Sequence, residues 1–325
     1  MTALRHRNIE VNGIRMHIAE QGDGPLLILC HGWPELWYSW RHQIPALAAL
    51  GFHVVAPDMR GFGQTDAPSR IEDYTILHKV GDMVGVVAAM NESQAIIVGH
   101  DWGAPIAWTS AMLRPDLFRA VGAMSVPHRP RGPAAPLSML RHAGLGNHYW
   151  IYFQTPGVAE AEFERDPDTT IRRLLYGTPN PNAAIDRENP LLVSEGKGFL
   201  DRTVVPEKLP AWLRDEDIAV FVDEYRRTGF RGGLNWYRNI DRNWELTAPW
   251  TNTGITTQIR QPALFVAGTR DPVIAGKRGA IAIEQMQQTV PHLTTRMIEG
   301  AGHWIQQERP DEVNAALIDF LSPLE

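Results

Sequence analysis

Residues 95–103 read Ala-Ile-Ile-Val-Gly-His-Asp-Trp-Gly and join an apolar run to a turn that carries an acid, Asp101. An uninterrupted apolar run of this length is typical of a strand covered on both faces, as in a parallel sheet. A helical pattern follows at 105–113. Gly-x-Asp-x-Gly thus lies between a strand and a helix, in the form of a nucleophile elbow with aspartate in place of serine. An aspartate that only caps the helix would fit this motif equally well.

Similar apolar runs recur along the chain, and each ends in turn residues: they span 26–30, 53–56, 120–126, 263–267 and 295–298. Before them, an alternating segment around Asn12-Gly13 predicts a β-hairpin with a type I′ turn. Helical patterns separate the runs or end the chain, at 44–50, 75–90 and 311–321. This order predicts an α/β fold, with a mostly parallel central sheet and helices on both faces.

The alternation stops in the stretch 132–253, which is rich in proline, glycine, tyrosine and tryptophan and has helical pieces such as 218–228. We interpret 132–253 as an inserted, mainly helical cap domain, and 1–131 together with 254–325 as the core domain. A long disordered insert is the alternative, and the high aromatic content argues against it.

Composition excludes several classes of protein. The net charge of -6 argues against a nucleic-acid surface, which would normally be basic. Cys30 is the single cysteine, so no intrachain disulfide forms. No apolar run is long enough for a membrane span, no His/Cys/Glu spacing suggests a metal, and no cofactor is implied. We therefore expect a soluble, cytoplasmic protein that binds neither nucleic acid nor membranes, in an oligomeric state that the sequence leaves open.

The run 26–30 leads into the loop His31-Gly32-Trp33-Pro34. Such a loop can aim the N–H of Trp33 into a site at the end of the sheet, where it would form an oxyanion hole with the N–H of Trp102. An ordinary Gly-Pro turn would contain the same residues. We expect His31 to be structural and to hold the loop by hydrogen bonds.

Two late strand ends supply partners for Asp101. Asp271 follows the run 263–267 and is placed to orient a histidine, and His303 follows the run 295–298 as that histidine. Each motif alone means little, but the order nucleophile, acid and histidine, each after a strand, is that of α/β-hydrolase active sites. The remaining histidines are interpreted as surface or packing residues.

A carboxylate nucleophile restricts the chemistry. Attack on a carbonyl carbon would form an anhydride, whereas displacement at a saturated carbon gives an alkyl ester on Asp101. Water activated by His303 would then attack the carbonyl of Asp101, and the oxyanion hole would stabilise the resulting intermediate. A halide needs only hydrogen-bond donors to leave, whereas an epoxide oxygen needs a proton, which a tyrosine hydroxyl can supply.

The chain resembles the α/β-hydrolase-fold epoxide hydrolases, particularly the soluble type, over nearly its whole length. The resemblance is carried by segments 31–35 (HGWPE), 60–66 (RGFGQTD), 99–103 (GHDWG), 302–304 (GHW), 149–157 (YWIYFQTPG) and 233–239 (GLNWYRN). It implies that a small-molecule epoxide and water are converted to a vicinal diol. It also implies that Tyr149 and Tyr237 are the two oxygen-binding acids, whereas from the residues alone a tyrosine in this stretch would be a packing residue. We give Tyr152 a structural role.

The high tryptophan count suits a large core or an aromatic-lined pocket. We expect five aromatic side chains to contact the substrate: Trp33, Trp102, Trp150, Phe153 and Trp304.

Other functions fit less well. A haloalkane dehalogenase shares the aspartate nucleophile. To bind the halide, however, it would usually have an asparagine at the position that Trp33 occupies here. The paired tyrosines also argue against a dehalogenase. A non-catalytic ligand-binding protein on the same fold would be expected to lack the nucleophile or the histidine. A serine esterase would need Gly-x-Ser-x-Gly at the elbow.

Overall fold

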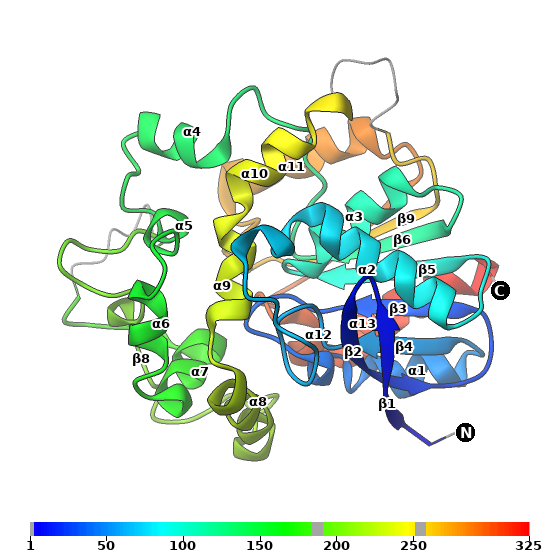
Figure 1. The fold of residues 1–325 in the computed structure, drawn as a ribbon, viewed down its shortest axis with the longest axis horizontal. Coiled ribbons are helices and arrows are strands. Elements are labelled where there is room, and N and C mark those ends of the chain that lie inside the picture. The colour runs from blue at the N-terminus through cyan, green and yellow to red at the C-terminus, as the bar shows by residue number, and fades with distance from the viewer. Residues whose placement is uncertain (1–2, 184–190, 251–257, 325) are drawn as a thin grey trace.

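The central sheet has eight strands in the order β1-β2-β4-β3-β5-β6-β9-β10. We describe residues 3–183, 191–250 and 258–324 of a computed structural model (Figure 1). The strands are β1 (Arg5–Val11), β2 (Ile14–Gln21), β3 (Leu26–Cys30), β4 (His53–Pro57), β5 (Ala95–His100), β6 (Phe118–Met124), β9 (Ala263–Gly268) and β10 (Leu293–Ile298). Strands β1, β2 and β4 pair antiparallel and all other neighbours pair parallel, which confirms the mostly parallel sheet.

The opening hairpin forms where the Asn-Gly pair predicts it. Asn12 and Gly13 connect β1 to β2 with φ values of 46° and 77°. Both values lie in the left-handed region that a type I′ turn requires, and asparagine and glycine adopt it most readily. The turn therefore sets the register of the first two strands.

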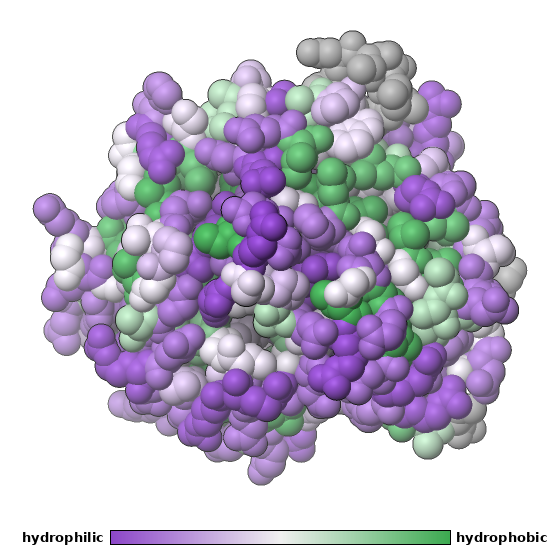
Figure 2. Space-filling view, in the orientation of Figure 1, coloured by the Kyte–Doolittle hydropathy of each residue, from purple (hydrophilic) through white to green (hydrophobic). Residues whose placement is uncertain are grey.

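Helices cover both faces of the sheet, as the strand–helix alternation predicts (Figure 1). These helices are α1 (Gln43–Ala49), α2 (Ile76–Ala89), α3 (Gly103–Leu113), α11 (Gly276–Thr289), α12 (Ile305–Glu308) and α13 (Pro310–Leu321). Along β5 the side chains alternate: Ile97 packs in one core with α2 and α3, whereas Ile96 and Val98 pack in a second core with α1 and α13. The face seen in Figure 2 is mainly hydrophilic, with its hydrophobic residues in separate groups.

A mainly helical segment lies between β6 and β9, and we call it the α4–α10 segment. Its elements are α4 (Pro136–His142), α5 (Tyr149–Tyr152), α6 (Val158–Phe163), α7 (Pro167–Tyr176), β7 (Thr178–Pro179), β8 (Thr203–Val204), α8 (Asp215–Thr228), α9 (Arg231–Arg238) and α10 (Ile240–Leu246). Buried Trp236 of α9 donates from Nε1 to the carbonyl oxygen of Arg60 at 3.1 Å, which ties this segment to the loop after β4.

Three details differ from or lie beyond the sequence predictions. Helix α11 was not expected, because its sequence has two glycines and few apolar side chains. Strand β6 spans 118–124, two residues earlier than the predicted 120–126. The expected domain boundary at 253/254 falls in 251–257, outside the described residues. Within the described ranges, no helix is long and apolar enough to cross a membrane.

Candidate active site

Asp101 sits at a tight turn between the end of β5 and the start of α3. Its φ is 49°, which is uncommon for a residue other than glycine, and its carbonyl oxygen accepts the N–H of Ala104 at 3.1 Å. A Cβ on Gly99 would overlap the carbonyl oxygen of Gly103, and a Cβ on Gly103 would overlap that of Cys30. The two glycines of the motif are therefore required for this close approach of strand, turn and helix.

The loop after β3 reaches the carboxylate of Asp101. The backbone N–H of Trp33 donates to Oδ1 of Asp101 at 2.8 Å. Trp102 follows Asp101 directly at the N-terminus of α3, and its indole packs edge-on against Tyr237 with 5.1 Å between centroids. The N–H of Trp33, one of the two groups expected to form an oxyanion hole, thus contacts one carboxylate oxygen of Asp101.

His31 holds this loop by hydrogen bonds, which confirms its expected structural role. Its Nδ1 lies 2.8 Å from the carbonyl oxygen of Gly32, and its Nε2 accepts the N–H of Met59 at 2.9 Å. A carbonyl oxygen only accepts, so the proton of the neutral ring lies on Nδ1. Burial lowers the pKa of His31, which agrees with a neutral ring.

The structure brings His303 and Asp271 together beside Asp101. Nδ1 of His303 lies 3.1 Å from each carboxylate oxygen of Asp271, and Nε2 lies 3.4 Å from Oδ2 of Asp101. Asp271 is fully buried, and its Oδ1 also accepts the N–H of Val273 at 2.9 Å. The imidazole is therefore oriented between two acids that lie 170 residues apart in the sequence.

The two acids control the charge of His303. Burial alone would lower its pKa, but the charge of Asp271 and the hydrogen bonds to Asp101 and Asp271 raise that pKa well above its usual range. Burial would likewise raise the pKa of Asp271, but the charge of His303 and the hydrogen bonds that Asp271 accepts hold it below its usual range. Both acids thus favour the protonated, imidazolium form of His303.

Tyr149 and Tyr237 come together although they lie on different helices, α5 and α9. Their ring centroids are 5.8 Å apart, and Tyr237 also packs edge-on against Trp33 at 5.5 Å. Burial is the largest cause of the raised pKa of both hydroxyls, and the charge of Asp101 adds to it. Both phenols are therefore protonated at neutral pH and can donate hydrogen bonds.

Tyr152 points elsewhere. Its hydroxyl donates to Oε2 of Glu162 at 2.8 Å, and the same carboxylate oxygen accepts the N–H of Phe199 at 3.0 Å. This bond ties α5 to α6 and supports the structural role expected for Tyr152.

The aromatic residues expected to contact substrate gather around these groups. Phe153 is fully buried, and its ring centroid lies 5.6 Å from that of Trp33 and 5.0 Å from that of Tyr237. The ring centroids of Trp150 and Tyr149 are 6.2 Å apart, and those of Trp304 and His303 are 4.7 Å apart. Trp33, Trp102, Phe153 and Tyr237 thus form a continuous aromatic cluster beside Asp101, whereas Trp304 borders the histidine.

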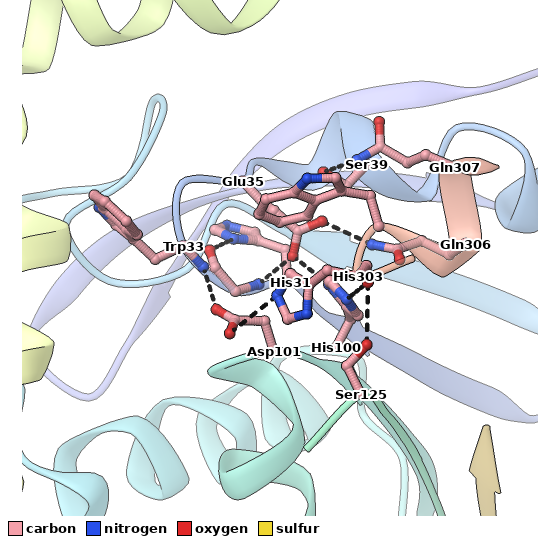
Figure 3. A network of polar contacts seen from close by, with 12 residues as sticks. His31, Trp33, Glu35, Ser39, His100, Asp101, Ser125, His303, Gln306 and Gln307 are labelled. Carbon is pink, nitrogen blue, oxygen red and sulfur yellow. Dashed lines mark hydrogen bonds and ion pairs between the residues drawn. The ribbon is translucent and has the colours of Figure 1, made fainter. Parts of the chain in front are cut away.

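Sequence reasoning missed a buried polar network behind the site (Figure 3). Nδ1 of His100 lies 2.7 Å from Oε2 of Glu35, and its Nε2 lies 2.7 Å from the carbonyl oxygen of His303. The second carboxylate oxygen of Glu35 accepts the side-chain amide of Gln306 at 2.7 Å. His100 is thus not the packing residue expected. The signal was its place inside the elbow motif, with Glu35 inside the HGWPE loop.

The charges in this network follow from its geometry. Nε2 of His100 faces a carbonyl oxygen, so it carries a proton, and Nδ1 lies against the carboxylate of Glu35. Burial would raise the pKa of Glu35, but the charge and hydrogen bond of His100 bring it to about 2. Across the described part of the chain, no group of three or more His, Cys, Asp or Glu residues is placed to hold a metal ion.

Comparisons with known proteins agree with this geometry. The family described as "alpha/beta hydrolase fold" matches residues 25–310. Epoxide hydrolase A of Mycobacterium tuberculosis is 45% identical over 100% of this chain and 99% of its own length. Epoxide hydrolase 1 of Siraitia grosvenorii is 41% identical over 99% of each chain. A crystal structure of epoxide hydrolase A from Mycobacterium thermoresistibile has a TM-score of 0.90 and 44% identity, covering 98% of each chain.

The fold and the family match make the chain an α/β hydrolase. Within that class it belongs to the epoxide hydrolase family.

Proposed function

We propose that the protein hydrolyses a small-molecule epoxide to a vicinal diol, through a covalent alkyl ester on Asp101. The observation that carries the proposal is the pair of adjacent phenols, Tyr149 and Tyr237: Tyr149 packs against Tyr237, and Tyr237 packs against Trp33 and Trp102, which flank Asp101. A displacement with a basic alkoxide leaving group needs a nucleophile and an acid on opposite sides of the broken bond. The relatives named as epoxide hydrolases support the same reaction.

In the first step, Oδ2 of Asp101 attacks a ring carbon and the ring C–O bond breaks. The N–H of Trp33 holds Oδ1, which leaves Oδ2 as the attacking atom. Tyr149 and Tyr237 hydrogen-bond the ring oxygen, and one of them gives its proton to the alkoxide as the bond breaks. The products of this step are an alkyl ester on Asp101 and a tyrosinate.

In the second step, His303 takes a proton from water, and the hydroxide attacks the ester carbonyl of Asp101. Charge then develops on Oδ1, where the N–H groups of Trp33 and Trp102 act as the oxyanion hole. Asp271 orients and stabilises the imidazolium that forms. When the intermediate collapses, the ester C–O bond breaks and the departing diol oxygen takes the proton of the added hydroxyl group, so Asp101 is again a carboxylate and His303 an imidazolium.

Ester formation also prepares His303 to act as a base. In the resting site the charge of Asp271 and the hydrogen bond to Asp101 keep His303 protonated. The ester carries no charge, so the first step removes one of these two stabilising acids and lowers the pKa of His303. The imidazolium can return its proton to the tyrosinate and then serve as the base of the second step.

Residues 132–253 act in this scheme as a cap domain over the core formed by 1–131 and 254–325. The α4–α10 segment provides both tyrosines, whereas the core provides Asp101, Asp271 and His303. Trp33, Trp102, Trp150, Phe153 and Trp304 form the wall that contacts the substrate and excludes water from the alkoxide.

A single turnover in heavy-oxygen water tests the mechanism. Enzyme in excess over styrene oxide should release diol without the label, because its new oxygen comes from Asp101, and the label should then appear in the peptide that contains Asp101. Mass spectrometry of the diol and of that peptide gives both readings. Label in the diol of the first turnover would contradict the ester. Halide release from a haloalkane without epoxide turnover would favour a dehalogenase instead.

A further inference from the structure

Strand β6 ends in a strained turn that points a buried hydroxyl at the histidine loop. Ser125, directly after β6, has a φ of 67°, and the N–H of Val126 donates to the carbonyl oxygen of Met124 at 2.8 Å. These features form a three-residue γ-turn of the rare, strained type with positive φ at its centre. Strain of this kind persists only where surrounding contacts enforce it, and it is concentrated at functional sites.

The contacts of Ser125 lead to the proposed base. Its backbone N–H donates to the carbonyl oxygen of Val266 on β9 at 3.0 Å, and its side chain is fully buried. Its hydroxyl donates to the main-chain carbonyl oxygen of His303 at 3.0 Å (Figure 3). The same hydroxyl also lies near Asp271, the acid that contacts Nδ1 of His303.

The carbonyl of His303 therefore has two donors, Ser125 from one strand end and Nε2 of His100 from another. Two donors occupy both lone pairs of a carbonyl oxygen, so the peptide plane that follows His303 is fixed in direction. The imidazole in turn has one orientation in which Nδ1 meets Asp271 and Nε2 meets Asp101.

We propose that Ser125 is a positioning residue of the reaction: its hydroxyl fixes the His303 loop, so that the imidazole is aligned to deprotonate the hydrolytic water. The proposal rests on the covalent mechanism proposed above. In that mechanism His303 acts as a base only in the second step. A positioning role for Ser125 therefore affects hydrolysis of the ester and leaves its formation unchanged.

Two substitutions distinguish the effect of the Ser125 hydroxyl from the effect of the backbone strain at this residue. Ser125→Ala removes the hydroxyl and keeps a Cβ at positive φ, whereas Ser125→Gly removes the hydroxyl and adopts that φ freely. If the hydroxyl is responsible, both variants should hydrolyse the ester about tenfold more slowly, the effect of losing one buried hydrogen bond. If backbone strain is responsible, Ser125→Gly should differ from Ser125→Ala.

The kinetic pattern distinguishes positioning from general damage. When ester hydrolysis limits turnover, kcat and KM fall together and kcat/KM, which reports ester formation, stays within about twofold of the wild type. Rapid quenching with styrene oxide and mass spectrometry should then show more alkylated enzyme at steady state than in the wild type. A loss of folded enzyme would lower kcat/KM without any accumulation of ester.

His303→Gln serves as the reference, because it should form the ester and not hydrolyse it. If His303→Gln accumulates no ester, the covalent mechanism is overturned, and the role of Ser125 falls with it. If His303→Gln accumulates ester but either Ser125 variant hydrolyses it at the wild-type rate, only the role of Ser125 is overturned. Thermal unfolding of each variant checks that the fold is retained.

Discussion

Replacing the buried Lys79 by methionine should stabilise the protein at neutral pH. Lys79 lies in α2 with its side chain fully buried, and its Nζ has no hydrogen-bond partner within the described structure. The ammonium group faces two indole rings instead, at 4.0 Å from the centroid of Trp236 and 5.0 Å from that of Trp102. The charges that act on Lys79 are those of Asp82 and Arg60, which pair with each other at 2.8 Å.

The size of the effect follows from the pKa of Lys79. Burial, opposed by the charge of Asp82 and assisted by that of Arg60, lowers it from about 10.5 to about 7. At about 1.4 kcal/mol per pH unit, this lowering of the pKa means that burying the charged ammonium group costs about 5 kcal/mol. Two desolvated cation–π contacts offset about 1–2 kcal/mol each. Methionine has a similar length and no charge, so we expect the free energy of unfolding to rise by about 1–3 kcal/mol at pH 7.

The effect should also depend on pH. Between pH 7 and 10.5 the unfolded chain holds a proton that folded Lys79 has released, so the wild type becomes more stable as pH rises through this range. The advantage of Lys79→Met should therefore shrink by about 1–3 kcal/mol between pH 6.5 and pH 9.0. Well below pH 7 the advantage should level off, because Lys79 is then protonated in both the folded and the unfolded state.

Urea unfolding of the wild type and Lys79→Met at these two pH values measures the effect. Lys208→Met, at an exposed lysine, is the matched control and should change stability little at either pH. An advantage of Lys79→Met that is equal at pH 6.5 and pH 9.0 would refute the reasoning, since it would mean that Lys79 does not titrate in this range.

Three further predictions concern separate parts of the molecule. Burial would raise the pKa of Asp217, but hydrogen bonds from Arg214 bring it to about 2. Asp217→Asn should thus lower the free energy of unfolding by about 1–2 kcal/mol at pH 7, and the difference should vanish between pH 4 and pH 2 in chemical denaturation. Changing Tyr149 and Tyr237 together to phenylalanine should slow ring opening at least about 10³-fold in single-turnover assays, and unchanged ring opening would exclude them as acids. Burial raises the pKa of the Cys30 thiol, so a thiol reagent should modify it only after denaturation, as absorbance assays would show.

Much of the fold could be predicted because its signals are local. Apolar runs marked the strands, Asn12-Gly13 marked the hairpin turn, and the glycines around Asp101 marked the elbow, each within about ten residues of sequence. Helix α11 escaped prediction because two glycines and scattered apolar residues weaken its pattern, and contacts such as that of buried Met286 hold it in place. Its stability comes from packing more than from propensity.

The sequence by itself determined which residues could react and the order in which they follow the strands. Only the tertiary structure decided how they meet. β6 pairs with β9 although the α4–α10 segment separates the two strands in the sequence. This pairing sets Ser125 beside Asp271 and His303. The pairing of Tyr149 with Tyr237 and the burial of Lys79 likewise depend on helices far apart in the chain. Local patterns specify turns and strands, whereas contacts between distant segments depend on how sheet and helices pack.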